Sequence, residues 1–258
     1  MRTSRSVNRR KKILELLIKN PILRVGDLHT LFDVSDETIR KDLIDMERQR
    51  VLVRRHGRIE SLVTSSDEQA VDVRANAHLE EKERIAQAAL EFIPDTEDQI
   101  IGMDAGTTTW CLARLLTERK GQTIVTNSMK NADLFASSDL SNQVYCPGGV
   151  LRAFDKAFYG PWTVRSLNSI RTNISILSTN GVRNWDGLGA ISYDDADVKR
   201  EFVRNTQYSI AILDASKFDT STLLEAVKWE ELDVVITGAG ISDADRERIE
   251  AKTRLITV

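Results

Sequence analysis

Residue types that mark secreted, membrane-spanning or metal-binding proteins are scarce in this sequence of 258 residues. The two cysteines, Cys111 and Cys146, cannot supply a disulfide scaffold or a four-ligand zinc site. The three histidines lie far apart and form no metal-binding pattern. No apolar run approaches the roughly 20 residues that a membrane-spanning helix needs. The basic residues 1–5 are not followed by the apolar core of a signal peptide. We therefore expect a soluble, cytoplasmic protein without a structural metal.

The charges divide the chain into a basic head and an acidic body. Residues 1–58 carry 15 Lys or Arg and 8 Asp or Glu, a net charge of +7. Residues 59–258 carry the other 21 Lys or Arg and the other 31 Asp or Glu, a net charge of -10, and the two parts sum to -3. The length predicts one or two domains, and 41% hydrophobic residues suffice for a folded core. A basic head indicates contact with a polyanion, although a solvated charge run would look the same.

The head contains the pattern of a helix-turn-helix motif. Residues 11–20 read as the end of an amphipathic helix, and a second, short helix over about 25–32 precedes a third helix. Ser35 is a good N-cap for that third helix and places Thr38, Arg40 and Lys41 near its N-terminus, away from its apolar face. In major-groove readers, the first turns of the second helix of the motif meet the base edges. This third helix is therefore the expected recognition helix.

A basic hairpin follows the recognition helix. Residues 51–53 and 59–63 predict two short strands, and the turn between them contains three arginines, a histidine and a glycine. Such a hairpin is a wing, suited to the phosphate backbone or the minor groove. His56 also fits an inert turn position. The predicted DNA contacts are Ser35, Thr38, Arg40, Lys41, Arg54, Arg55, His56 and Arg58.

These residues resemble the head of the DeoR family of bacterial transcription regulators. Residues 34–43 read Val-Ser-Asp-Glu-Thr-Ile-Arg-Lys-Asp-Leu, and residues 54–57 read Arg-Arg-His-Gly. The family pattern runs V-S-x-x-T-I-R-x-D-L, followed by R-x-H-G-G. Lys41 stands where a second arginine is usual, which keeps the charge but loses the guanidinium fork. Arg58 stands where a second glycine is usual, which makes the wing tip stiffer and more basic.

The rest of the chain predicts an α/β domain. We expect a winged helix-turn-helix domain over 1–60 (the motif itself at about 23–42), a linker over 61–78 and an effector-binding domain over 79–258. Short apolar runs alternate with helical stretches from residue 99 onward, which predicts a mostly parallel sheet covered on both faces. The expected strands are 100–103, 123–125, 144–146, 174–177, 209–213, 234–237 and 255–258.

Short polar residues and glycines follow five of these strands, and ligands bind beyond the carboxyl ends of parallel strands. Residues 104–109 enter a helix with one glycine and three threonines, which can hold a phosphate through backbone N–H groups and hydroxyls. Each of these polar segments, taken alone, is also typical of an ordinary helix cap or turn. Five such segments at one edge of the sheet favour a ligand site. Lys199 and Lys217 would supply positive charge, unless they are simple surface lysines.

The same segments resemble the DeoR-family effector domain, whose fold is similar to that of ribose 5-phosphate isomerase. The family pattern comprises D-x-G-T-T-T, T-N-S, G-G, N-G, a helix lysine and D-x-S-K-F. Asn173, Gly189 and Asp219 depart from it, and the hydroxyl lost at Gly189 bears on sugar selectivity. The resemblance implies a phosphorylated sugar or sugar derivative as effector. The contacts it implies are Asp104, Gly106, Thr107, Thr108, Thr109, Thr126, Asn127, Ser128, Gly148, Gly149, Asn180, Gly181, Lys199 and Lys217.

The patterns together predict a two-domain DNA-binding regulator, by the family's usual role a repressor of carbohydrate catabolism genes, modulated by a phosphorylated sugar. A single winged head contacts one half-site, so we expect a homo-oligomer, a dimer or a tetramer. We expect no cofactor and no membrane partner. One alternative is a sugar-phosphate isomerase-like enzyme with a DNA-binding appendage, in which Asp104, Lys199 and Lys217 are acid or base groups. Another is a DNA-architectural protein with an inert body.

Overall fold

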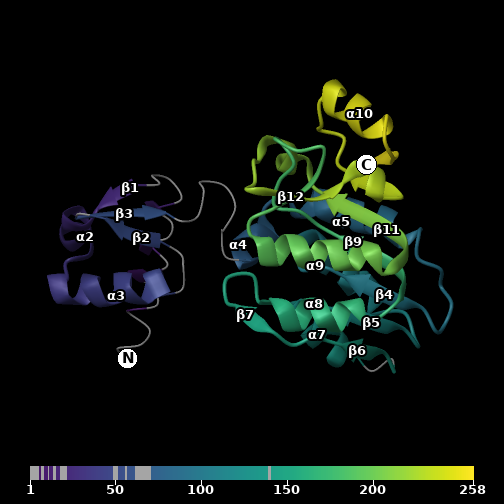
Figure 1. Ribbon diagram of the computed structural model, residues 1–258, viewed down its shortest axis with the longest axis horizontal. Coiled ribbons are helices and arrows are strands. Elements are labelled where there is room, and N and C mark those ends of the chain that lie inside the picture. The colour runs from purple at the N-terminus through teal and green to yellow at the C-terminus, as the bar shows by residue number, and fades with distance from the viewer. Residues whose placement is uncertain are drawn as a thin grey trace. The chain divides into compact units, whose positions relative to one another are not determined.

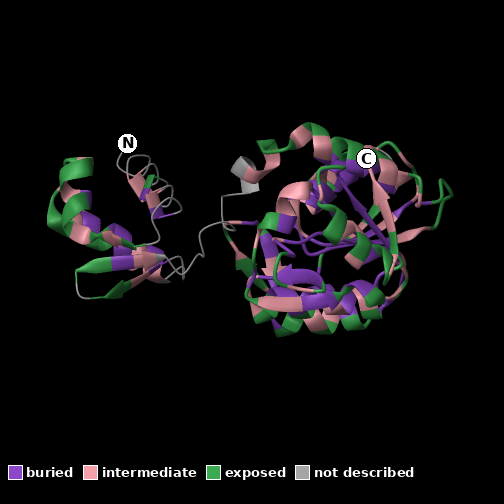
Figure 2. Cartoon of the chain, turned by 90° about the horizontal axis from the view of Figure 1, so that it is seen from above, coloured by how far each residue is buried: buried purple, intermediate pink, exposed green. Residues whose placement is uncertain are grey.

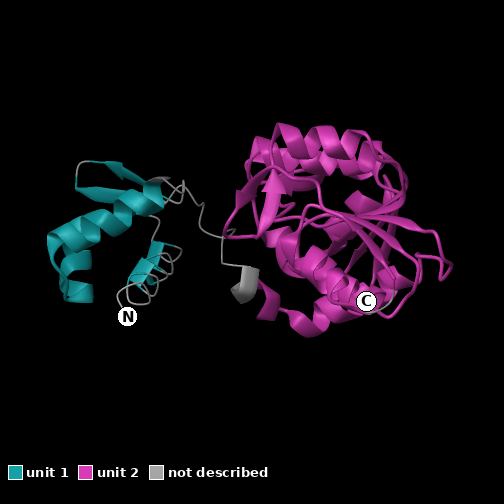
Figure 3. Cartoon of the chain, turned by 90° about the horizontal axis from the view of Figure 1, so that it is seen from below, with its two compact units in different colours: residues 1–69 teal, residues 70–258 magenta. Residues whose placement is uncertain are grey.

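The chain forms two compact units, Met1–Gln69 and Ala70–Val258, in the computed structural model (Figure 3). The structure describes residues 6, 9–10, 12–13, 16–17, 22–48, 52–55, 57–61, 71–138 and 141–258. His56, one of the predicted DNA contacts, lies outside these described residues, as does most of the helix expected over 11–20.

The first unit is a small three-stranded sheet packed against helices. Its elements are β1 (Ile22–Arg24), α2 (Val25–Phe32), α3 (Asp36–Arg48), β2 (Leu52–Arg55) and β3 (Arg58–Ser61). The strands are antiparallel and lie in the order β1-β3-β2. Ile39, Leu43 and Met46 recur at helical spacing on α3 and form its buried face. Ile13 and Leu17, both helical, complete this core.

The wing differs from its prediction in two ways. Arg54, Arg55 and Arg58, expected in a turn, extend the strands of the hairpin instead. Strand β1 was not predicted, because three residues after a proline give no readable alternation. The wing sheet therefore has three strands rather than two.

The second unit is an α/β fold (Figure 1). Its helices are α4 (Val71–Asn76), α5 (Leu79–Leu90), α6 (Thr107–Leu116), α7 (Met129–Ala136), α8 (Pro161–Asn168), α9 (Tyr193–Arg204) and α10 (Asp243–Glu250). Its strands are β4 (Ile100–Met103), β5 (Thr123–Thr126), β6 (Gln143–Tyr145), β7 (Val150–Arg152), β8 (Ala157–Tyr159), β9 (Thr172–Leu177), β10 (Gly187–Ala190), β11 (Thr206–Leu213), β12 (Leu224–Lys228), β13 (Val234–Thr237) and β14 (Arg254–Thr257). Helix α4 falls within the range predicted as linker.

Seven strands form the central sheet, in the order β14-β13-β11-β9-β4-β5-β6. Every pairing in it is parallel, which confirms the predicted mostly parallel sheet. Each of these seven strands overlaps one of the seven runs expected from the sequence. Two small antiparallel sheets, β7-β8 and β10-β12, were not expected.

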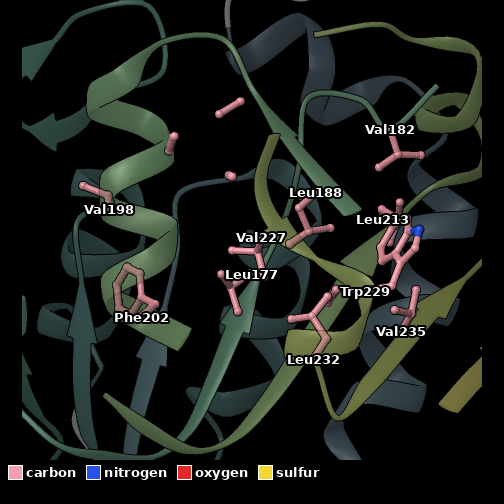
Figure 4. Close-up of a cluster of buried hydrophobic side chains, with 14 of the residues drawn as sticks. Leu177, Val182, Leu188, Val198, Phe202, Leu213, Val227, Trp229, Leu232 and Val235 are labelled. Atoms are coloured by element: carbon pink, nitrogen blue, oxygen red, sulfur yellow. The ribbon is translucent and has the colours of Figure 1, made fainter. Parts of the chain in front are cut away.

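Both faces of the central sheet are buried, as Figure 2 shows in purple. Ile210 and Ile212 pack with α5, α6 and α7, whereas Ala211 and Leu213 face the opposite core, because successive side chains alternate. That second core is covered by α8, α9 and the β10-β12 sheet, and part of it, from Phe202 to Trp229, is drawn in Figure 4. Burial on both faces is typical of a parallel sheet. Within the described residues, no helix has the length and apolar character of a membrane span.

Candidate functional site

Helix α3, the predicted recognition helix, presents an exposed polar surface at its N-terminus. Arg40 is exposed and has no ion-pair partner among the residues that the structure describes. Lys41 lies 3.3 Å from Glu37, an exposed pair that contributes little stability and can exchange partners. The hydroxyls of Ser35 and Thr38 lie 2.9 Å apart, so these two side chains fix one another at the start of the helix.

The buried side of α3 is held by ion pairs that the sequence did not reveal. Asp42 is buried and accepts hydrogen bonds from Arg9 Nε at 2.5 Å and Ser6 Oγ at 3.0 Å. Arg10 lies 3.4 Å from the same carboxylate and also donates to Asp45 at 3.2 Å. Two of the basic residues of the head therefore compensate a buried carboxylate and position the helix, instead of adding to a free cationic surface.

The arginines of the wing divide between its two faces. Arg54 donates to Glu47 through both its backbone N–H, at 3.0 Å, and its Nε, at 2.8 Å. These hydrogen bonds lower the pKa of Glu47. Arg55 lies 3.4 Å from Glu60 and remains 68% exposed. Arg58 is exposed and lacks an ion-pair partner in the described part of the wing.

The topology of the second unit defines a crevice at the carboxyl edge of the sheet. From β4, the chain runs outward through β5 and β6 on one side, and later through β9, β11, β13 and β14 on the other. The switch point therefore lies between β4 and β9, and ligands of open α/β sheets bind beyond the strands there. The loops after these strands touch, because Ser178 Oγ donates to the carbonyl oxygen of Ala105 at 3.2 Å. A β-carbon built on Gly106 would lie 2.0 Å from Ser178 Oγ.

A buried charge cluster lies at this switch point. Lys199, on α9, donates to Asp104, which follows β4, and lies 3.2 Å from Asp195 Oδ1. All three side chains are at most 2% exposed. The positive charge predicted to meet a phosphate at Lys199 is thus shared between two carboxylates in this structure.

Proton affinities in the cluster follow from burial and these neighbours. Burial raises the pKa of Asp104, although the ammonium of Lys199 opposes the shift. Burial alone would also raise the pKa of Asp195, but Lys199 and Arg152 together lower it. Burial alone would lower the pKa of Lys199, but Asp104 and Asp195 raise it. Lys199 is therefore held in its charged form.

The threonines at the start of α6 have different roles. Thr109 Oγ1 donates to the carbonyl oxygens of Asp104 and Gly106, each at 2.9 Å, so it stabilises the turn. Thr107 and Thr108 are buried within the first turn. Gly106 is the N-cap and supplies no capping side chain, which leaves the first backbone N–H groups of α6 available to an anion.

The polar residues after β5 are buried and mostly hold their own loop. Thr126 Oγ1 accepts a hydrogen bond from the backbone N–H of Ser128 at 3.1 Å, and Ser128 caps α7 by accepting from Asn131 at 3.3 Å. Asn127 donates through its Nδ2 to the carbonyl oxygen of Phe158 at 3.3 Å. Its Oδ1 is buried without a hydrogen-bond partner among the described residues. Asn127 is therefore the best ligand candidate of the three predicted residues in this loop.

The loops after β9 and β11 lie side by side. The backbone N–H of Val182 donates to the carbonyl oxygen of Lys217 at 2.9 Å. A β-carbon on Gly181 would lie 2.2 Å from the carbonyl oxygen of Thr220. Asn180 and Lys217 are both half-buried. Lys217 has no carboxylate partner among the described residues, which makes it the available cation at this edge.

The two glycines after β6 serve the local backbone. Gly149 has a φ of +154°, and a β-carbon there would lie 2.2 Å from Thr163 Oγ1. The carbonyl oxygen of Gly148 accepts a hydrogen bond from that same hydroxyl at 2.9 Å. Gly148 itself is exposed. These contacts account for glycine at 149 without a ligand.

Sequence reasoning missed a second group of charged residues beside the switch point. Arg152, on β7, donates to Asp155 through Nε at 2.9 Å and to Ser192 Oγ at 3.3 Å. Tyr159 donates to the same carboxylate at 2.9 Å, and the Arg152 guanidinium lies 3.8 Å from the centre of the Tyr159 ring. Burial raises the pKa of Tyr159 well above its usual value. The signal for Arg152 was its place three residues after Gly149, but nothing nearby in sequence identified its partners.

Lys82, on α5, is another buried cation that the sequence did not single out. Its Nζ donates to the carbonyl oxygens of Arg74, at 2.7 Å, and Ala77, at 2.6 Å, and lies 3.8 Å from Asp214. Burial lowers the pKa of Lys82, although Asp214 opposes the shift. This side chain connects the end of α4 to the loop after β11. The residues that the structure describes contain no group of three or more His, Cys, Asp or Glu side chains that could hold a metal ion.

Comparison with known proteins places both units in one family. A family model described as the DeoR-like helix-turn-helix domain matches residues 9–65, and one described as the DeoR C terminal sensor domain matches residues 77–239. An uncharacterized HTH-type transcriptional regulator of Bacillus subtilis is 30% identical over 253 residues, 96% of this chain and 95% of that protein. The glycerol-3-phosphate regulon repressor of Escherichia coli is 29% identical over 236 residues, 91% of this chain and 92% of that protein.

Among solved structures, a D-ribose-5-phosphate isomerase in complex with phospho-erythronic acid is 18% identical, covers 54% of this chain and 53% of that chain, and has a TM-score of 0.39. The relatives that match most of the chain are named as transcription regulators and not as enzymes. The protein is accordingly a DNA-binding regulator rather than an isomerase-like enzyme with an appendage. The chain belongs to the DeoR family of transcription regulators.

Proposed function

We propose that the first unit binds an operator through α3 and the wing, and that a phosphorylated sugar bound at the switch point of the second unit modulates this binding. The single observation that carries the effector site is the uncapped start of α6 at the junction of β4 and β9, where the loops after these two strands touch. An anion is stabilised at such a helix start by backbone N–H groups and the helix dipole.

On the DNA side, Arg40 and Thr38 are the proposed base contacts, because both lie at the N-terminus of the recognition helix. Lys41, Arg55 and Arg58 are exposed and are proposed to contact phosphates. Arg54 would have to exchange Glu47 for a phosphate, so its contribution is expected to be smaller. Ser35 holds Thr38 in place through the contact of their hydroxyls.

On the effector side, we assign the phosphate to the backbone of residues 106–108 and to Lys217. Lys199 has two carboxylate neighbours, so its proposed role is to position Asp104, whose carboxyl oxygens can accept hydrogen bonds from sugar hydroxyls. Asn127, whose Oδ1 has no partner, and Asn180 are the proposed further contacts to the sugar.

The remaining features of the proposal rest on the architecture of DNA readers. Two half-sites require two winged heads, so we propose that the protein acts as a homo-oligomer. We propose repression as the sign of regulation, supported by the name of the Escherichia coli relative, and the cytoplasm as its location, where bacterial DNA lies.

Calorimetry on the full chain tests the effector site. The probes are glycerol 3-phosphate, fructose 1-phosphate, glucose 6-phosphate and the three unphosphorylated compounds. At least one phosphate is expected to bind and its unphosphorylated counterpart to bind far more weakly, because charge-assisted hydrogen bonds are about twice as strong as neutral ones. Thr108→Val keeps the side-chain volume but removes a hydroxyl of the first turn, and should weaken binding of that phosphate while leaving DNA binding intact. Equal binding of the phosphorylated and free sugar would refute the phosphate assignment.

A further inference from the structure

Three arginines lie in one row across the sheet of the wing. The register pairs Arg24 of β1 with Arg58 of β3, and Arg58 with Arg55 of β2. Residues directly opposite one another in antiparallel strands point to the same face, with Cβ atoms about 4.5–5.5 Å apart. The three guanidinium groups therefore emerge from the same face of three adjacent strands. Arg24 lies outside the hairpin that the sequence indicated as the wing.

The row lies on the outer face of the sheet. Leu23 and Ile59, opposite one another in the neighbouring register position, pack into the core of the unit, so the arginine row points the other way. Arg24, Arg55 and Arg58 are all exposed. Arg54 pairs with Ile59 in the register and turns toward Glu47, which separates it from the row.

The row also lies at the tip of the wing. Arg55 and Arg58 are the last pair before the hairpin turn. The backbone N–H of Val25 donates to the carbonyl oxygen of Gly57 at 3.0 Å, which fixes the end of β1 to that turn. Arg24 is thereby held beside the part of a wing that approaches DNA.

This arrangement does not stabilise the isolated unit. Like charges directly opposite one another on adjacent strands are destabilising. Glu60 is the one carboxylate that pairs with the row in the described residues, at 3.4 Å from Arg55. One carboxylate against three guanidinium groups leaves a net charge of about +2 on this strip, which a polyanion would neutralise.

We propose that Arg24, Arg58 and Arg55 form a phosphate-binding strip that grips the backbone of double-stranded DNA, and that Arg24 is a DNA-contact residue of this protein. The proposal rests on DNA binding by the first unit. Arginine suits this role because its planar fork matches phosphate oxygens. Contacts to phosphates carry no sequence information, so the strip adds affinity for every duplex.

The test is fluorescence anisotropy with the full chain and a labelled 30-base-pair duplex of mixed sequence, in KCl from 25 to 150 mM. Each phosphate contact contributes about 0.9 to the slope of log affinity against log salt. Arg24→Ala and Arg58→Ala are each expected to reduce this slope by about 0.9. Over the sixfold range of salt, the loss of affinity of each variant should therefore be about fivefold smaller than the loss of affinity of wild type. Arg24→Lys should keep most of the slope, because it retains the charge.

Two further variants serve as controls. Arg171, an exposed arginine of the second unit, should leave the slope unchanged when replaced by Ala. Arg54→Ala should reduce the slope less than Arg24→Ala, because Arg54 is engaged by Glu47. Arg24 makes no capping hydrogen bond to α2, so its replacement should leave the thermal midpoint of the unit unchanged.

The outcomes separate the proposal from the function on which it rests. A wild-type slope in Arg24→Ala, together with a reduced slope in Arg58→Ala, would overturn the proposed role of Arg24. An equal reduction of the slope in Arg171→Ala and Arg24→Ala would also overturn it, because the effect would then not depend on the position of the arginine. Absence of salt-dependent binding by wild type would instead contradict DNA binding itself.

Discussion

Replacing Lys199 by methionine would leave two buried carboxylates without their shared cation. Asp104 and Asp195 are each almost fully buried, and Lys199 contacts both. Breaking a buried pair by removing one partner costs about 3–5 kcal/mol, because an uncompensated charge remains in the interior. A domain of 150–250 residues loses about 2–4 °C in Tm per kcal/mol, so Lys199→Met should lower the Tm by about 6–20 °C at pH 8.

The loss of stability in Lys199→Met should depend on pH. Burial raises the pKa of Asp104, and the ammonium that opposes this shift is absent from the variant, so folded Asp104 takes up a proton at a higher pH than it does in the unfolded chain. Where the folded state binds more protons, stability rises as the pH falls. The difference between variant and wild type should therefore be large at pH 8 and smaller at pH 5.

Differential scanning calorimetry of the full chain at the two pH values measures both effects. Adding Asp104→Asn to Lys199→Met should recover part of the lost stability, because one of the two stranded charges is removed. Lys228→Met, at an exposed lysine 3.7 Å from Glu230, is the matched control and should change the Tm little. A loss of stability that is equal at pH 5 and pH 8 would show that packing, and not charge, holds this cluster together.

Two other substitutions test the remaining sites. Arg40→Ala should weaken operator binding by about 1–3 kcal/mol and relax specificity at one base position, without a change in Tm, because Arg40 is exposed; binding to an operator and its single-base variants measures this, and unchanged operator affinity would remove Arg40 from the interface. Gly106→Ala places a β-carbon 2.0 Å from Ser178 Oγ, so it should force the loops after β4 and β9 apart and abolish phosphate binding in calorimetry; wild-type affinity in this variant would place the effector elsewhere.

The main sheet could be predicted because its strands are buried on both faces. Segments such as 209–213 and 234–237 read as short continuous apolar runs, whereas other stretches of the unit, such as α5 and α9, have helical periodicity. The strands that were not predicted are short, and their own residues show no strand pattern. β10 reads Gly-Leu-Gly-Ala, and β7 contains three residues after two glycines, so neither carries alternation that identifies a strand.

The candidate site was predictable only as far as neighbouring residues define it. The turn of residues 104–109 could be recognised from its own composition, since its glycine and threonines act within one helix start. The pairing of Lys199 with Asp104 could not, because Asp104 lies 95 residues away in sequence. Arg24 shows the same limit on the wing: its place beside Arg58 depends on strand pairing, which its own neighbours do not reveal.

The buried ammonium of Lys82 links two parts of the second unit that are far apart in sequence. Lys82 donates hydrogen bonds to the backbone at Arg74 and Ala77, a few residues after the unit begins. It also lies 3.8 Å from Asp214, which precedes the turn that carries Lys217. Separating them would strand a buried cation, at a cost of several kcal/mol. The position of the turn that carries Lys217 is therefore tied, through one buried side chain, to the end of the first helix of the unit.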